Sequence, residues 1–473
     1  FKHEMWRDEL QAWLISKESE NIIEIFKNLK YEGHQGLWHI LLFPLTRIFD
    51  NPISMQFIHV IFSTCTIFLI FKYSPFSRVQ KLFLTFNYFL FFEYSIISRN
   101  YGIGVLFIFL FCTFFKKRQK NLIKLSFLIL LLSQTSFIGL LLAIALFLTL
   151  IIEEFIFYRN NNKTLSIQYR KKGIISLFIS MTGFLLAFFQ LMFQFRNYTL
   201  AFPPKPQQIF DSGGAMLNSF FPIPSIGINF WNSNLFLSNE VTLVISIILF
   251  FVLNYFFIDY LRNSKAALFL YIFSFSILTS FFLLKFSGYF RHHGFIFIGL
   301  LSALWICKYS SKKEISNSKK KTFNYTFNLL LAIQAFAGII AGSIDYFYPF
   351  SAAQETAQFI LSKKLENSFI IGYEDTAALS VLGHINKRRN FYYVQGDREG
   401  SFIKWDNKRI RPIDSTKIVE KSLEASSAGK NVLLILNRSI DDLNIKKNLF
   451  EELFVSSDAI VKDENFFVYK FIK

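Results

Sequence analysis

The strongest constraint on how this chain can fold is a series of long apolar runs separated by short basic connections. Runs long enough to cross a bilayer can be placed in ten segments, at residues 53–72, 80–96, 100–115, 122–134, 137–158, 173–194, 239–261, 265–285, 290–307 and 323–343. Of its 473 residues, 52% are hydrophobic and 63 are Phe, and one soluble core cannot bury that much apolar surface. We therefore expect an α-helical polytopic membrane protein with about ten spans.

Lysine and arginine gather in every second connection between these runs, within residues 72–81, 116–124, 159–172, 262–265 and 308–321. Cytoplasmic loops of membrane proteins carry this excess, so these five connections are expected on the cytoplasmic side. An even number of spans then puts both chain ends on the outer face. Membrane orientation thereby explains the net charge of +18, and a nucleic acid is not an expected partner.

One further apolar segment, Gly36–Phe49, is predicted to be an amphipathic helix lying on the outer membrane surface. It is short for a span and contains Pro44. Counting it as a span would also reverse every later loop and place the lysines outside.

Three domains follow from this topology. Residues 1–52 form a first outer loop with an acidic motif and juxtamembrane helices, and residues 53–343 form the transmembrane domain, with a proline-rich outer loop at 195–238. Residues 344–473 lose the Phe-rich character and are expected to form a small soluble α/β domain outside the membrane. Its predicted strands are 368–373, 390–394, 432–437 and 466–471. Its predicted helices are 351–365, 375–385, 415–428 and 445–455.

With this topology, several polar residues are expected together on the outer face: Asp8, Glu9, Glu32, His34, Arg99, Tyr101, Gln134, Arg291 and His292. Lys and Arg concentrate on the cytoplasmic side of membrane proteins, so arginines on the outer face are uncommon. The predicted outer positions of Arg99 and Arg291 therefore indicate a role other than membrane orientation. A pair of guanidinium groups beside a membrane suits an anionic lipid headgroup, because guanidinium binds phosphate through two parallel hydrogen bonds.

A carboxylate pair and two arginines beside a lipid surface favour one reaction type. A carboxylate takes a proton from an acceptor hydroxyl, which attacks the anomeric carbon of a sugar attached to a lipid phosphate. We expect Asp8 to be the general base, with Glu9 as its catalytic neighbour. Arg99, Tyr101, Arg291 and His292 are the predicted ligands of the lipid phosphate, and they stabilise its charge as it departs. Glu32, His34 and Gln134 are predicted to shape the substrate site.

The same motifs resemble those of the GT-C superfamily of membrane glycosyltransferases, which includes protein O-mannosyltransferases and aminoarabinose transferases. The similar features are the acidic pair Asp8–Glu9 followed by an amphipathic helix, Ser98–Tyr101 at the outer end of a span, and Tyr289–His292 opening a late span. A soluble outer C-terminal domain is also found in bacterial relatives.

The resemblance implies an inverting transferase of the bacterial inner membrane, with its active site on the periplasmic face. It implies a polyprenyl-phosphate sugar as donor and a protein, glycan or lipid as acceptor. The superfamily's acidic motif follows a first span, so the resemblance implies that this span is missing from the chain. Where many relatives have a histidine, this chain has Gln134–Ser136, so a proton-relay role there is not expected.

Other interpretations stay open at this stage. Asp8 and Glu9 suit the first turn of a helix, and Arg99 with Tyr101 suits a helix end anchored at the membrane surface. A secondary transporter, a lipid flippase, or a scaffold that recruits partners through residues 345–473 would also fit the composition. No metal ligands and no certain cofactor are predicted, although a divalent cation beside Asp8 and Glu9 remains an alternative.

Overall fold

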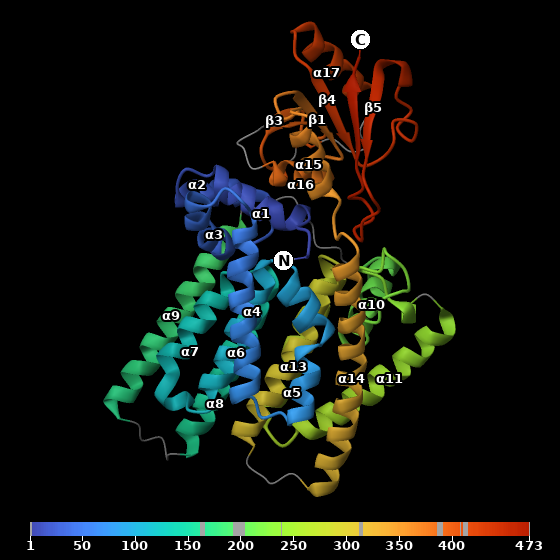
Figure 1. Cartoon of the computed structure of the whole chain (residues 1–473). Helices are drawn as coiled ribbons and strands as arrows, with labels where there is room; N and C mark the ends of the chain where they lie inside the picture. Colours follow the sequence, from blue (N-terminus) through green and yellow to red (C-terminus); the bar gives the residue numbers. More distant parts are fainter. Residues whose placement is uncertain are drawn as a thin grey trace.

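The computed structural model describes residues 2–160, 166–192, 204–237, 239–311, 316–385, 391–406, 408–409 and 415–472. Its helices form a bundle, and an α/β domain made by the C-terminal part of the chain stands at one end of that bundle (Figure 1). The three N-terminal helices lie between the bundle and this domain (Figure 1).

Seven helices in the described part of the chain are long and apolar enough to cross a membrane. They are α4 (Ile53–Tyr73), α8 (Phe137–Asn160), α9 (Ile167–Met192), α11 (Glu240–Leu261), α12 (Lys265–Leu284), α13 (Phe290–Ser310) and α14 (Asn317–Phe347). Each coincides with one of the ten predicted segments. The chain therefore has the helices of a membrane-embedded protein.

The other three predicted spans are shorter elements in the structure. Helices α6 (Asn100–Phe115) and α7 (Arg118–Ser133) have 16 residues each, fewer than a perpendicular span needs. The prediction of one helix over 80–96 is wrong, because the segment is divided into α5 (Arg78–Thr85) and a π-helix at Tyr88–Ile96.

Asn87 causes this division. Its side-chain oxygen accepts hydrogen bonds from the backbone N–H groups of Phe89, at 3.0 Å, and Leu90, at 3.2 Å, and so begins a new helix. Gly338 of α14 faces the break, where an added Cβ would lie 2.1 Å from the carbonyl oxygen of Phe86. The break is therefore packed directly against another helix, and a glycine makes that approach sterically possible.

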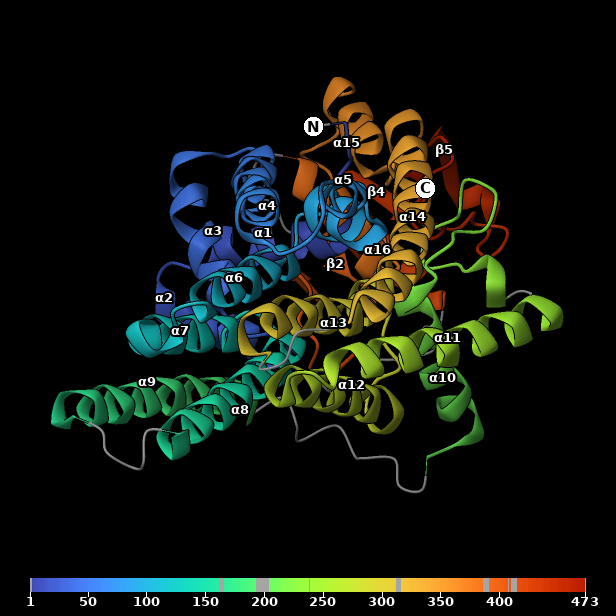
Figure 2. The same ribbon diagram turned by 90° about the horizontal axis from the view of Figure 1, so that it is seen from below.

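Helix α13 lies in the middle of the bundle, while α9 and α11 lie at opposite edges (Figure 2). Every residue from Phe290 to Cys307 is buried, which suits a helix that is apolar on all sides. By contrast, α9 and α11 expose large side chains such as Phe178 and Phe251, as expected of helices that face lipid.

The C-terminal domain is built on one six-stranded mixed sheet with strand order β3-β2-β1-β4-β6-β5. The strands are β1 (Phe369–Tyr373), β2 (Phe391–Tyr393), β3 (Arg398–Gly400), β4 (Val432–Leu436), β5 (Phe450–Val455) and β6 (Phe467–Phe471). Strand β1 runs parallel to β2 and β4, and the other pairs are antiparallel. Helices α15 (Ala353–Ser362) and α16 (Asp375–His384) share a core with one face, and α17 (Thr416–Ser427) with the other.

Four predicted strands and three predicted helices of this domain lie close to their expected positions, although Asn390 is outside the described residues. The helix predicted at 445–455 is wrong, because Phe450–Val455 forms the edge strand β5. Its apolar residues also suit a helix, but antiparallel pairing with β6 and a contact between Phe450 and Phe471 favour the strand. The short strand β3 was not predicted.

The N-terminal helices α1 (Arg7–Glu18), α2 (Ile22–Asn28) and α3 (Leu37–Ile48) pack against one another, and α1 packs against α16 of the C-terminal domain. Leu14 and Ile15 of α1 share a hydrophobic core with Val381 and Leu382 of α16. Gly383 makes the approach possible, because a Cβ there would lie 2.9 Å from that of Leu10. Segments at the two ends of the sequence are thus parts of one packed unit.

Helix α3 occupies the segment predicted to be amphipathic, and its membrane position remains a prediction. The predicted outer loop at 195–238 contains a helix, α10 (Pro206–Phe220), which packs against α12 and α13. Residues 195–203 and 238 of that loop lie outside the described residues.

A buried histidine joins the N-terminal segment to α14. His3 Nε2 lies 3.0 Å from Glu9 Oε2, and its Nδ1 lies 2.9 Å from Asp345 Oδ1. Burial alone would lower the pKa of His3, but the two carboxylates outweigh this effect and raise it to about 10. The imidazolium therefore donates from both nitrogens and compensates two buried negative charges.

We expect His3→Ala to destabilise the fold by about 3–5 kcal/mol, because it leaves Glu9 and Asp345 buried without their cation. The wild-type contribution is complete below the ordinary histidine pKa of 6.5 and is lost as the pH rises through about 10. Thermal unfolding of the purified chain between pH 6 and 10 measures it, with the exposed neighbour Lys2→Ala as control. Equal melting temperatures for His3→Ala and Lys2→Ala would contradict this account.

Candidate active site

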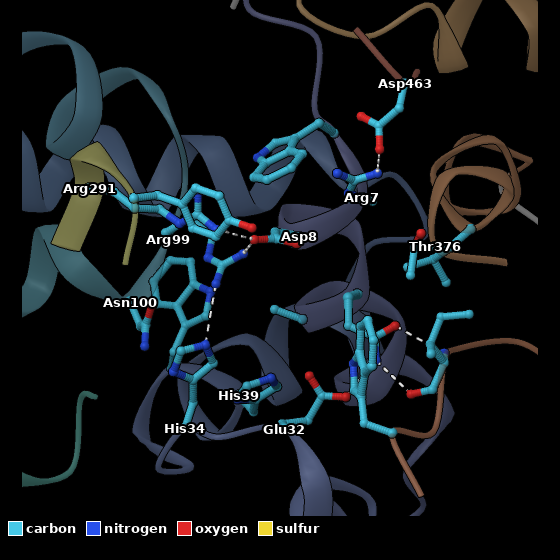
Figure 3. A pocket seen from close by; sticks show the side chains of 18 of the residues that line it. Arg7, Asp8, Glu32, His34, His39, Arg99, Asn100, Arg291, Thr376 and Asp463 are labelled. Atoms are coloured by element: carbon cyan, nitrogen blue, oxygen red, sulfur yellow. Dashed lines mark hydrogen bonds and ion pairs between the residues drawn. The ribbon is translucent and has the colours of Figure 1, made fainter. Parts of the chain in front are cut away.

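Asp8 lies between two guanidinium groups (Figure 3). Its Oδ2 is 2.6 Å from Arg99 Nη1 and 3.1 Å from Arg291 Nη2. Both arginine side chains are 8% exposed, whereas the Asp8 side chain keeps 29% of its surface accessible. One carboxylate oxygen thus holds two nearly buried cations, and the group remains open to a ligand.

Three helix beginnings bring these side chains together. Asp8 is in the first turn of α1, Arg99 immediately precedes α6, and Arg291 is in the first turn of α13. The positive end of a helix dipole favours Asp8 but disfavours the arginines. Because of this cost, Arg99 and Arg291 need Asp8 as a counter-ion.

Aromatic rings provide the rest of the environment of Arg291. Its guanidinium carbon lies 4.6 Å from the ring centroid of Tyr289, 5.4 Å from that of Trp6 and 5.6 Å from that of Trp231. These distances are within the range of cation–π attraction. The arginine is therefore held in place by rings as well as by its ion pair.

The charge of Asp8 is set by these neighbours. Burial would raise the pKa of its carboxyl group, but the guanidinium groups of Arg99 and Arg291 outweigh that effect and lower the pKa below the ordinary value. Asp8 is thus ionised at neutral pH.

Glu9 has a different surrounding, because neighbouring residues on a helix point in different directions. Its carboxylate is fully buried and accepts hydrogen bonds from His3, from the Trp6 backbone at 3.3 Å and from the Ser98 backbone at 2.6 Å. It lines neither of the two cavities described below. The expected partnership of Asp8 and Glu9 at one ligand is therefore not what the geometry shows, and Glu9 instead fixes the start of α1 beside Arg99.

The predicted phosphate ligands Tyr101 and His292 contact each other. The backbone N–H of Tyr289 donates to His292 Nδ1 at 2.9 Å, so we assign the ring proton to Nε2. That nitrogen lies 2.8 Å from the Tyr101 hydroxyl oxygen. With its oxygen accepting from His292, the Tyr101 hydroxyl is free to donate its own proton to a ligand.

Glu32 and His34 lie close to Asp8, as expected. Oε1 of the Glu32 carboxyl group accepts a hydrogen bond from Gln11 Nε2 at 2.7 Å, and burial raises the pKa of this carboxyl group to about 8. His34 Nε2 lies 3.4 Å from Arg99 Nη2, and burial together with that cation lowers the histidine pKa to about 3. Both side chains are therefore uncharged at neutral pH.

Gln134 does not reach this group. Its side chain donates to the carbonyl of Gly183 at 2.8 Å and accepts from Gln190 Nε2 at 2.6 Å. Gln190 in turn accepts from the backbone N–H of Gly36 at 2.9 Å. Gln134 thus supports the turn that carries Glu32 and His34, and it is not among the residues that line the two cavities described below.

Two adjoining cavities meet at the Asp8 group. The polar cavity has a volume of about 420 Å³ and the apolar cavity about 270 Å³. Five residues line both of them: Asp8, Glu32, His34, Arg99 and Arg291. The apolar cavity continues between Phe137, Leu191, Phe281 and Phe286, and Tyr101, Lys285 and His292 also line it. A charged junction therefore separates a polar chamber from an apolar one.

The C-terminal domain forms one wall of the polar cavity. In Figure 3, Thr376 and Asp463 face Asp8 from one side, and Arg99, Asn100 and Arg291 lie on the other. The wall residues are Glu374, Thr376, Leu379, Ile403, Trp405 and Asp463. Arg7 pairs with Asp463 and so connects this wall to α1.

Sequence reasoning missed most of the aromatic and C-terminal lining. Trp6 adjoins the acidic motif and was a detectable signal. Tyr289 belongs to the motif Tyr289–His292 and was also indicated. Trp231 and Trp405 come from distant segments, and nothing in their local sequence indicates that they meet.

A cation is disfavoured at Asp8 by the guanidinium groups on either side of it. Within the part of the chain that the structure describes, no cluster of three or more His, Cys, Asp or Glu side chains could hold a metal ion.

No family model matches this chain, and no curated protein does.

The buried carboxyl of Glu32 predicts a specific pH dependence. A folded-state pKa of about 8, above the ordinary 4.5, means that the folded chain binds the proton more tightly than the unfolded chain. The contribution of Glu32 to stability therefore falls as the pH rises from about 4.5 to about 8. We expect Glu32→Gln to flatten the dependence of melting temperature on pH in that window, and the exposed Glu420→Gln to leave it unchanged. A slope identical to wild type in Glu32→Gln would show that this carboxyl titrates normally.

Proposed function

We propose that this protein is a membrane glycosyltransferase that transfers a sugar from a polyprenyl-phosphate donor to an acceptor hydroxyl. In this proposal the chain resides in a bacterial inner membrane, with ten membrane segments, and the Asp8 junction faces the periplasm. The GT-C resemblance belongs to the same proposal. The observation that carries it is the meeting of an apolar and a polar cavity at two arginines and one carboxylate.

The prenyl chain, the phosphate and the sugar of the donor match the apolar cavity, the arginine pair and the polar cavity, in that order. A polyprenyl chain suits the apolar cavity between Phe137, Leu191 and Phe281. Its phosphate suits Arg99 and Arg291, since guanidinium groups bind phosphate oxygens through charge-assisted hydrogen bonds. The sugar then extends into the polar cavity. A soluble substrate would have no use for the apolar cavity.

The step proposed is a single displacement. The acceptor oxygen forms a bond to the anomeric carbon while the bond from that carbon to the phosphate oxygen breaks, which inverts the configuration. The acceptor's proton passes to the carboxylate of Asp8, and the polyprenyl phosphate departs with the bonding electrons. Arg99 and Arg291 stabilise the negative charge that grows on the departing phosphate.

Donor binding would also prepare Asp8 for this role. Its pKa is low in this structure because both guanidinium groups stabilise the ionised form. A bound phosphate shares these cations and adds negative charge nearby, and both effects raise the proton affinity of a neighbouring carboxylate. The base is thus strengthened only when its substrate is present.

Helix capping is a poor alternative explanation for Asp8. Glu9 is the residue that accepts from the backbone N–H at the start of α1, whereas Asp8 Oδ2 contacts arginines from two other helices. A role in capping α1 alone does not explain why arginines from two other helices contact Asp8.

Asp8→Asn tests this function in the purified chain, reconstituted in vesicles with undecaprenyl-phosphate-linked mannose, glucose and aminoarabinose as donors. Cellobiose, chitobiose and the peptide Ala-Ser-Ala are supplied as acceptors. We expect release of undecaprenyl phosphate to fall by about 10²–10⁴, the usual contribution of a general base. Glu9→Gln should instead lower the melting temperature and keep most of the rate below its unfolding transition, and Glu420→Gln serves as the surface control.

A wild-type rate in Asp8→Asn would exclude Asp8 as the base. Movement of the sugar lipid across the bilayer without release of undecaprenyl phosphate would identify a transporter instead.

A further inference from the structure

We infer that the wall of the polar cavity contributed by the C-terminal domain, centred on Trp405, binds an uncharged saccharide that is the acceptor of the transferred sugar. This inference rests on the proposed function and names the class of acceptor, which the charged junction alone does not. Four observations carry it.

The first observation is the concentration of tryptophan. The chain has six Trp residues, and four of them, Trp6, Trp38, Trp231 and Trp405, line this one cavity. A pyranose ring presents C–H groups on its faces, and these pack on the electron-rich face of an aromatic ring. A cavity with several indoles and few aliphatic side chains is therefore suited to sugars.

The second observation is a set of buried polar atoms that lack a hydrogen-bond partner among the described residues. Six of them belong to side chains that line the cavity: Trp6 Nε1, Trp38 Nε1, His34 Nδ1, His39 Nδ1, Asn100 Oδ1 and Arg291 Nε. Buried polar groups are normally paired, and these six atoms are covered by neighbouring side chains. Small rotations of the lining side chains would turn them toward a ligand in the cavity, and a polar ligand would satisfy them where an apolar one would not. Five are donors or neutral ring nitrogens, which suit the hydroxyl oxygens of a sugar.

The third observation is that Trp405 is held in position but is not buried. The residue is 39% exposed, and the Arg409 guanidinium carbon lies 4.8 Å from the ring centroid. Arg409 pairs with Asp375 at 3.3 Å, and Gln11 of α1 bonds both the N–H and the carbonyl of Ile403, two residues before Trp405. A fixed, accessible ring is the arrangement that a stacking platform requires.

The fourth observation is the charge of this wall. Its ionisable residues that line the cavity are Glu374 and Asp463, and Asp463 is already paired with Arg7. Among the described residues, the lining of this wall therefore offers no cation that would bind a phosphate or a carboxylate. The anionic part of the donor is drawn to Arg99 and Arg291 at the opposite side of the cavity (Figure 3). An uncharged saccharide is thus the ligand that suits the C-terminal wall. The volume of about 420 Å³ fits a small ligand, not a folded protein surface.

Binding to the full chain in nanodiscs tests this inference. The probes are the disaccharides cellobiose and chitobiose, the peptide Ala-Ser-Ala, and undecaprenyl phosphate, each followed by saturation-transfer NMR or tryptophan fluorescence. We expect wild type to bind at least one disaccharide and not the peptide. Trp405→Ala should weaken that binding by about tenfold, as truncation of an aromatic anchor does, and Trp405→Phe by less. Undecaprenyl phosphate affinity should stay within about twofold in both variants, because the arginines that bind it are unchanged.

The exposed Leu423→Ala on α17 of the same domain is the matched control, and melting temperatures verify that each variant is folded. Wild type that binds undecaprenyl phosphate but neither disaccharide would overturn the inference, as would peptide binding alone or a Trp405→Ala variant with wild-type saccharide affinity. Equal loss of saccharide and undecaprenyl phosphate in Trp405→Ala would assign this wall to the donor instead. Saccharide binding without any undecaprenyl phosphate binding would leave this site standing and overturn the proposed function.

Discussion

The ion pairs between Asp8 and the two arginines are the interaction on which the rest of this structure depends. They join the beginnings of α1, α6 and α13, which come from distant parts of the sequence. Two nearly buried guanidinium groups at helix N-termini would be costly without a counter-ion. The same carboxylate keeps an accessible side, so the group that holds the helices together is also available to a ligand.

The supporting contacts explain how α1 reaches this position. His3 connects Glu9 to Asp345 of α14, and the Ser98 backbone donates to Glu9 beside Arg99. On its other side α1 packs against α16 and bonds Ile403 through Gln11. Helix α1 therefore places its acidic residue between the helix bundle and the C-terminal domain. In our proposal these two sides supply the donor and the acceptor.

Much of this arrangement could be predicted from the sequence, and the failures have physical causes. Apolar runs and basic connections located seven of the long helices, because hydropathy reports directly on burial in a membrane. The break at Asn87 was missed because its local cap is a single polar residue inside an otherwise continuous apolar run. The strand β5 was missed because it depends on pairing with a distant strand, β6. Asp8, Arg99 and Arg291 were singled out as unusual charges. Glu9 points away from the Asp8 site because neighbouring residues on a helix point in different directions. The position of Trp405 at the cavity could not be predicted, because only the folded chain brings this distant segment there.

The most direct measurement is a cryo-electron microscopy structure of the full chain in nanodiscs with undecaprenyl phosphate bound. The account predicts phosphate oxygens at about 3 Å from both Arg99 and Arg291, with the prenyl chain between Phe137 and Phe281. It also predicts that Asp8 is still beside the phosphate, with its carboxylate turned toward the polar cavity. A phosphate bound away from these arginines, with the Asp8 ion pairs unchanged, would contradict the central claim.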